Sequence, residues 1–194
     1  MGSVKKREEE AFEKNKNIRH LHNKILMEAF LAEMDGQTLS KISKRQILNY
    51  LFDIENWGLY EIELFGNFTI FFSPEENHQF VHLLRKKKNH FSSERRYIEL
   101  ASKLLLNILL KDILLGTKYG DDILKEIEQL LNREGFYAEK MSAQFFKGIL
   151  MIQRNQKTDG EKLCLKSIQF FYDFEENHKG KLYRQFLSEQ LNHR

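Results

Sequence analysis

The regular spacing of amphipathic segments is the feature that most constrains the fold of this chain. Its 194 residues include one proline and ten glycines, which leaves few breakers and favours long helices over short strands and turns. Apolar positions recur at helical spacing, and the first helices of successive pairs are expected near residues 18, 58, 97 and 137. A period of about 40 residues is typical of a solenoid, in which neighbouring pairs bury one another's apolar faces. We therefore predict an all-α fold, a right-handed superhelix of tetratricopeptide-like hairpins with about nine helices.

Several helix starts carry a capping box, in which serine or threonine is followed three residues later by glutamate or glutamine. The clearest is "SPEE", where Ser73 can cap, Pro74 suits the first helical position and Glu76 completes the box. Two further boxes are predicted, Ser43 with Gln46 and Thr158 with Glu161. The final helix is expected from about Gly180 to Leu191.

The segment from Gln144 to Ser167 fits the tetratricopeptide pattern best. Gly148 stands where the first helix of such a unit needs a small residue for close packing, and Gly160 and Cys164 occupy packing positions of the second helix. Cys164 is the only cysteine, which excludes an internal disulfide and favours a reducing cytoplasm. Its packing position predicts a buried thiol rather than a catalytic nucleophile.

Charge and hydropathy argue against several functions. The chain has 31 basic and 28 acidic residues, a formal net charge of +3, and both signs are spread along it, whereas a DNA-binding domain concentrates positive charge on one face. No apolar run approaches the roughly 20 residues that span a membrane, and the first stretch, "MGSVKKREEE", lacks the apolar run of a secretory signal. We expect residues 1–17 to be a charged lead-in or the remnant of a tag or linker, and residues 18–194 to be the helical-repeat domain.

The segment "FDIENWGLYEIELFGN" places carboxylates beside aromatic residues, which raises the possibility of an active site. Glu61 and Glu63 are two apart, however, so on a helix they point about 200° away from each other and cannot form a carboxylate dyad. We expect Trp57 to fill a corner between two helices. No nucleotide, phosphate or hydrolase motif is found, and the chain is not predicted to be an enzyme.

His78 and His82 lie four residues apart, a spacing that can hold a metal on one face of a helix. No third ligand is evident from the sequence, and the position after His78 is a glutamine rather than a metalloprotease glutamate. Solvated surface histidines are the favoured interpretation. We accordingly predict no metal and no cofactor.

The stretch "LNYLFDIENWGLYEIELFGN" closely resembles the hallmark motif of the Rgg/GadR/MutR family of transcriptional regulators. The sequence departs from that motif at Leu59, where an aromatic residue is common. The likeness continues through "NKILMEAFLAEMDGQTLSK" and through three later helical segments. The matched motif positions are Glu55, Asn56, Trp57, Gly58, Tyr60, Glu61, Leu64, Phe65, Gly66 and Asn67.

The resemblance implies the architecture and partners of that family. Its members join an N-terminal helix-turn-helix domain to a tetratricopeptide-like C-terminal domain, which dimerises and in some branches binds short peptide pheromones in the cytoplasm. No helix-turn-helix is recognised here, so residues 18–194 would be the ligand-binding and dimerisation domain, and DNA would be contacted only through the missing part. A homodimer, a short signalling peptide and a cytoplasmic location are expected.

A peptide groove is expected on the concave face of the superhelix, with the small positions Gly66 and Gly148 used as anchors. For the apolar members of the set below, ordinary packing between helices is an equally good explanation. A scaffold or dimerisation module without a small ligand also stays open. The predicted ligand-binding residues are Tyr60, Glu63, Asn67, Ile70, Asn107, Lys111, Ser142, Phe145, Ile149, Ile152 and Gln153.

Overall fold

The computed structural model describes residues 2–87 and 93–192 of the chain, and in these residues it contains helices and no strand. The predicted all-α class is confirmed, and the ten helices found in the described part are close to the nine expected. They are α1 (Gly2–Asn15), α2 (Ile18–Met34), α3 (Lys41–Asp53), α4 (Leu59–Phe68), α5 (Pro74–Lys86), α6 (Arg95–Leu115), α7 (Gly120–Leu130), α8 (Tyr137–Gln153), α9 (Lys157–Asp173) and α10 (Asn177–Asn192).

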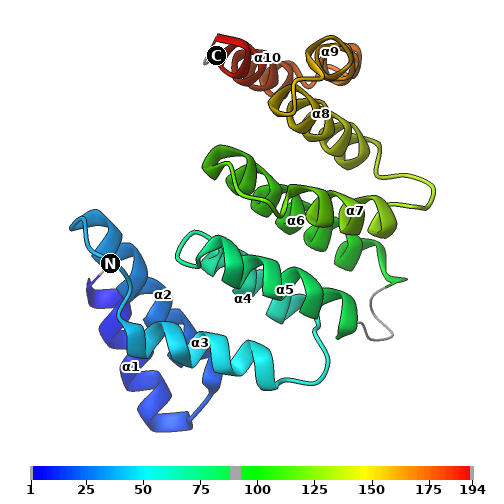
Figure 1. Cartoon of the computed structure of the whole chain (residues 1–194). Coiled ribbons are helices and arrows are strands. Elements are labelled where there is room, and N and C mark those ends of the chain that lie inside the picture. The colour runs from blue at the N-terminus through cyan, green and yellow to red at the C-terminus, as the bar shows by residue number, and fades with distance from the viewer. Residues whose placement is uncertain (1, 88–92, 193–194) are drawn as a thin grey trace.

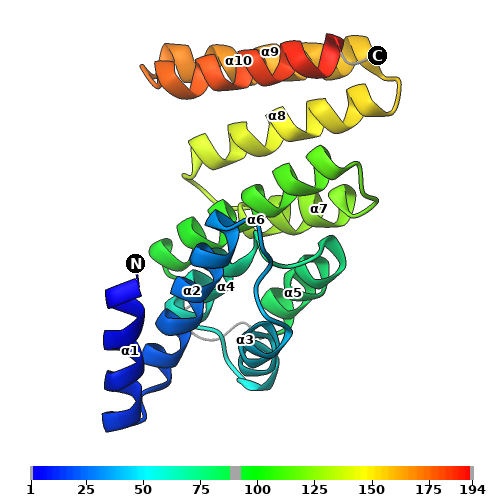
Figure 2. The same cartoon turned by 90° about the vertical axis from the view of Figure 1, so that its left-hand side faces the viewer.

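Four successive helix pairs, α2/α3, α4/α5, α6/α7 and α8/α9, build the molecule and α10 follows them (Figure 1). The first helices begin at residues 18, 59, 95 and 137, close to the predicted period. Figure 2 shows that α2, α4 and α6 form one layer and that α3, α5 and α7 form the other. Each first helix packs on the first helix of the next pair, and α5 packs on α7.

The charged N-terminal segment forms helix α1, which packs along α2 (Figure 1). The contact is largely polar. The Glu8 carboxylate lies 2.7 Å from Nδ1 of His20 and accepts a hydrogen bond from Asn23. The pKa of Glu8 is lowered mainly by its hydrogen bond with His20. Lys24 adds an ion pair with Glu9 at 2.6 Å.

The segment around Trp57 is a packed corner between α3 and α4, as expected. The Trp57 indole is fully buried, and its Nε1 donates to the Leu51 carbonyl at 3.1 Å. Its ring contacts those of Phe65 and Phe80, with centroids 5.8 and 5.9 Å away. This corner therefore positions α4 through apolar burial, reinforced by a satisfied indole hydrogen bond.

Glu61 is a structural residue of the same corner. Its Oε2 accepts a hydrogen bond at 2.8 Å from the backbone N–H of Gly58, which precedes α4. Its Oε1 accepts another at 2.8 Å from the Tyr50 hydroxyl of α3. The buried carboxylate thus satisfies an orphan donor at the helix start and ties two helices together.

Of the predicted capping boxes, Ser73 with Glu76 is confirmed, and the other two are wrong. Helix α3 begins at Lys41, because Ser40 accepts from the Ser43 N–H at 3.1 Å while Ser43 itself donates to Glu28. Helix α9 begins after Gln156, without a side-chain cap. The reason is a tight turn, in which Asn155 takes a left-handed φ of 66° and starts α9 before Thr158.

Candidate functional site

The first-helix layer carries two exposed stripes that contain several predicted ligand-binding residues. Glu63, Asn67 and Ile70 lie on or just after α4 at spacings of four and three residues, and all three are exposed. Asn107 and Leu114 are exposed on α6 and lie seven residues, about two turns, apart. Because α4 packs on α6, the two stripes are neighbours on one face of the molecule.

Lys111 ties these two helices together. Its Nζ donates hydrogen bonds to the carbonyl oxygens of Thr69, Ile70 and Phe72, at 2.9, 3.2 and 2.7 Å. These carbonyls follow the end of α4, where the helix leaves acceptors without partners. Burial lowers the pKa of Lys111. In this structure Lys111 therefore has a structural role, and its contact with a ligand stays a prediction.

A hollow of about 500 Å³ lies at the C-terminal end of α6, next to the exposed stripe of this helix. This volume lies in the range of small-ligand sites, roughly 300–1,000 Å³. The exposed side chains of Leu114 and Leu115 form its α6 side. Its complete lining is Ile113, Leu114 and Leu115 from the end of α6, Gly116 just after it, Gln153 from α8, and Phe186, Glu189 and Gln190 from α10.

Gln153 is the only predicted ligand residue among the lining residues of this hollow. Its Nε2 donates to the Ile113 carbonyl at 3.3 Å and to Oε1 of Gln190 at 3.2 Å, so three helices meet at this amide. The arrangement combines apolar side chains with two adjacent amides. Such a lining can bury apolar side chains of a ligand and pair with its backbone groups.

Tyr60 lies on the α2 side of α4 and is half-buried. Its hydroxyl is 2.7 Å from Nδ1 of His22, and the Arg19 guanidinium lies 4.4 Å from its ring centroid. Burial lowers the pKa of His22 to about 4 and raises that of Tyr60 to about 12. At neutral pH, His22 and Tyr60 therefore form an uncharged hydrogen-bonded contact between α2 and α4. Neither residue lines the hollow.

The four remaining predicted residues, all on α8, are buried in the core. Phe145 stacks on Tyr183 of α10 with ring centroids 4.1 Å apart, and the Ser142 hydroxyl donates to the Ala138 carbonyl. Helix α10 packs on the α8 face that the sequence pattern assigns to the groove. A ligand contact by these residues stays a prediction, and it would require α10 to move. The four are Ser142, Phe145, Ile149 and Ile152.

Sequence reasoning missed Leu114, Leu115 and Phe186 as candidate ligand contacts. Leu114 and Leu115 are 61% and 57% exposed, although they end α6, the longest of the described helices. A signal was present in the sequence, because Leu114 and Leu115 are the last two residues of the helix before Gly116, the glycine that ends it. The contribution of Phe186 depends on how α10 packs across α8, which local sequence does not specify.

One group in the described residues has the donor types and separation to hold a metal ion. It consists of His78 and His82 on α5 and Asp122 on α7, and it lies outside the hollow. Among the described helices, none is both long and apolar enough to cross a membrane.

Stacked helix pairs with an exposed first-helix face define a helical-repeat protein of the tetratricopeptide-like class. A family model for the C-terminal domain of the HTH-type transcriptional regulator Rgg matches residues 5–185. The chain therefore belongs to this family, which is one of transcriptional regulators and not of enzymes.

Solved structures share this fold. The SHP pheromone receptor Rgg2 of Streptococcus dysgalactiae is 19% identical with a TM-score of 0.72, over 97% of this chain and 76% of that one. A putative transcriptional regulator from Listeria monocytogenes EGD-e is 17% identical with a TM-score of 0.79, over 97% and 67%. A cysteine-to-serine variant of the S. dysgalactiae receptor is 21% identical with a TM-score of 0.75, over 95% and 72%. Among curated proteins, the comparison finds no match.

Proposed function

We propose that this chain is the sensing domain of a cytoplasmic transcriptional regulator and that its ligand is a short apolar peptide. The observation that carries the proposal is the hollow between α6, α8 and α10. Family membership supports a regulatory role, and the S. dysgalactiae relative is described as a pheromone receptor. The family resemblance adds short secreted peptides as the class of ligand.

The peptide is proposed to lie along the exposed stripes and to end in the hollow. Amide side chains occur along this path at Asn67, Asn107 and Gln153, where they can pair with groups of an extended peptide backbone. Apolar side chains alternate with them at Ile70 and Leu114, both more than half exposed. This mixture of polar and apolar contacts suits a peptide better than a uniformly polar metabolite.

Regulation requires that the peptide distinguish two arrangements of the protein, because equal affinity for both would shift nothing. The proposed arrangements are two states of a homodimer. The side chain of Leu182 on α10 is 51% exposed, which supports an apolar contact between the two subunits at this end of the chain. In this proposal the regulator contacts DNA through a helix-turn-helix domain, the type of domain that gives the family its description.

Isothermal titration calorimetry with synthetic apolar peptides encoded beside the gene tests the proposal. We expect one of them to bind, and Leu114→Ser to weaken that binding about 10- to 100-fold, which corresponds to the loss of one buried leucine contact. Leu165→Ser on α9 is the matched control, because Leu165 is an exposed leucine outside the hollow. Equal affinities of the two variants would contradict the proposed position, and binding by none of the peptides would favour a scaffold without a small ligand.

A further inference from the structure

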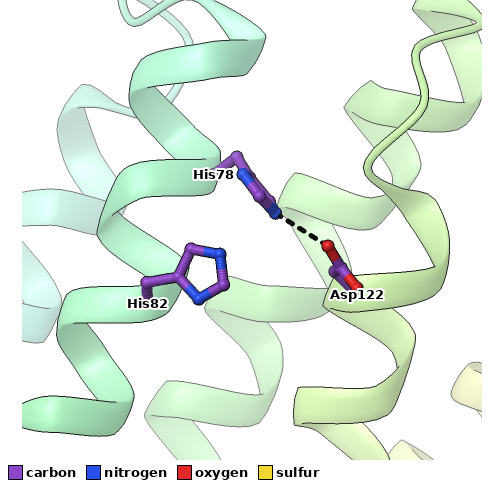
Figure 3. A group of neighbouring side chains, drawn as sticks. All are labelled: His78, His82 and Asp122. Carbon is purple, nitrogen blue, oxygen red and sulfur yellow. Dashed lines mark hydrogen bonds and ion pairs between the residues drawn. The ribbon is translucent and has the colours of Figure 1, made fainter.

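The strongest feature outside the proposed peptide site is a three-residue cluster between α5 and α7. His78 and His82 project from one face of α5, and Asp122 projects from the start of α7 toward them (Figure 3). Nε2 of His78 lies 3.3 Å from Oδ2 of Asp122. One ligand atom from each of the three residues lies within 4.8 Å of the others.

We propose that His78, His82 and Asp122 bind a divalent transition-metal ion of the zinc class, which clamps the second helix of one hairpin to that of the next. Two imidazoles and one carboxylate are a donor set that suits Zn²⁺ or Co²⁺, whereas Ca²⁺ and Mg²⁺ prefer all-oxygen ligands. The third ligand that the sequence did not reveal is Asp122, which lies 44 residues after His78.

The distances fit such an ion with a small adjustment. Tetrahedral zinc with bonds of about 2.0–2.1 Å requires neighbouring ligand atoms to be about 3.3 Å apart, and the His78–Asp122 pair already has that separation. His82 is exposed and its ring already lies edge-on to that of His78, with centroids 4.5 Å apart, so a rotation of this side chain closes the remaining distance. The ion would take the place of the hydrogen bond that now joins Nε2 of His78 to the carboxylate, with the proton of neutral His78 on Nδ1.

The surrounding structure holds the two helices in position for this site. The His78 ring is stacked on Tyr119 with centroids 4.2 Å apart, which limits its rotation. Farther along the same pair of helices, Arg85 of α5 donates to Glu126 of α7 at 3.1 Å. The confirmed capping box fixes the start of α5. The His78 donor is therefore preorganised, which lowers the cost of ordering the site.

The clamp is separate from the proposed peptide site. Its ligands come from the second-helix layer, whereas the exposed stripes and the hollow belong mainly to the first helices and α10. An ion here would restrict motion between the α4/α5 and α6/α7 hairpins. Metal binding and peptide binding are therefore expected to be measurable independently of each other.

Calorimetric titration of the untagged chain with ZnCl₂ tests the site. We expect saturable binding of one ion per chain, and a loss of about 10- to 100-fold or more in affinity in His82→Ala and in Asp122→Asn. CoCl₂ should produce visible absorption bands of cobalt with mixed nitrogen and oxygen ligands, and both variants should lose them. These two substitutions alter exposed side chains, so they spare the packing that His78 makes with Tyr119.

His178→Ala and Asp121→Asn are the matched controls. Both residues are exposed, and Asp121 neighbours the proposed ligand but pairs with Arg154 instead. The controls should retain wild-type affinity for zinc. No saturable binding by the wild-type chain, or an equal loss in the controls, would overturn the site, and unchanged affinity in Asp122→Asn would overturn the clamp between helices.

Zinc should also raise the melting temperature. At free zinc about 100 times the dissociation constant, a site present only in the folded chain would raise it by about 5–10 °C. His82→Ala should abolish this shift and His178→Ala should keep it. A shift of the same size in both variants would contradict the assignment.

Discussion

Two glycines in first helices, Gly66 and Gly148, share a position in the repeat pattern but differ in the space around them. A Cβ added at Gly66 would meet only the Leu104 side chain, at 3.9 Å, which is an ordinary contact. A Cβ added at Gly148 would lie 2.6 Å from Sγ of Cys164 and 2.6 Å from the carbonyl oxygen of Gly160. That oxygen belongs to the backbone of α9, so a side chain at Gly148 must push the two helices apart.

Alanine substitution should therefore have opposite effects at these two positions. Within a helix, alanine is favoured over glycine by about 0.5–1 kcal/mol, and Gly66→Ala should gain this amount of stability. In Gly148→Ala the same gain is outweighed by overpacking of up to about 3 kcal/mol. The net loss is about 2 kcal/mol, or about 4–8 °C in melting temperature for a chain of this size.

Thermal and urea unfolding followed by circular dichroism would measure both variants against the wild type. Because repeat arrays can unfold in parts, agreement between the two methods is needed before free energies are compared. A Gly148→Ala chain as stable as the wild type would show that the space between α8 and α9 does not require glycine. Equal destabilisation of Gly66→Ala and Gly148→Ala would likewise show that the space around each glycine does not decide the effect.

Three further substitutions test the contacts that hold the first-helix face. Lys111→Met should cost about 1.5–3 kcal/mol, because it leaves three carbonyls after α4 without their charged donor; an unchanged urea midpoint would contradict this role. Glu61→Ala should cost about 2–3 kcal/mol by removing the partner of the Tyr50 hydroxyl and the Gly58 N–H, and a loss of the same size in a Tyr50→Phe background would show that the two side chains do not interact. Burial raises the pKa of Asp112 from 3.8 to about 6, so its favourable contribution is present below pH 4 and is lost as pH rises to 6. Asp112→Asn should therefore match the wild type below pH 4 and be more stable by up to about 3 kcal/mol above pH 6, whereas a constant difference across this range would exclude the titration.

The sequence was sufficient for the helical period because that period follows from local apolar spacing. The first helices begin at residues 18, 59, 95 and 137, against expectations near 18, 58, 97 and 137. Capping was less predictable, since Ser43 is occupied by a hydrogen bond to Glu28, a residue of another helix. A side-chain partner that is distant in sequence decided which serine capped α3.

The candidate site was predictable only in part, for the same reason. Exposed Asn67 and Asn107 follow directly from helical periodicity. The burial of Phe145 depends on α10, because Tyr183 and Phe186 of that helix cover its ring. Asp122 approaches His78 only because α5 packs on α7. Periodicity therefore identifies a face of each helix, but the neighbouring elements decide whether that face is open.

Peptide binding at the hollow is the central claim, and a calorimetric comparison of the wild-type chain with Gln153→Ala tests it most directly. The probe is whichever apolar peptide encoded beside the gene binds the wild-type chain. Gln153 lies between Ile113 and Gln190 in the lining. Its replacement by alanine should lower the affinity for the peptide about tenfold or more, because a lost hydrogen bond leaves its partners unpaired. Unchanged affinity in a folded Gln153→Ala chain would contradict the claim that the peptide lies there.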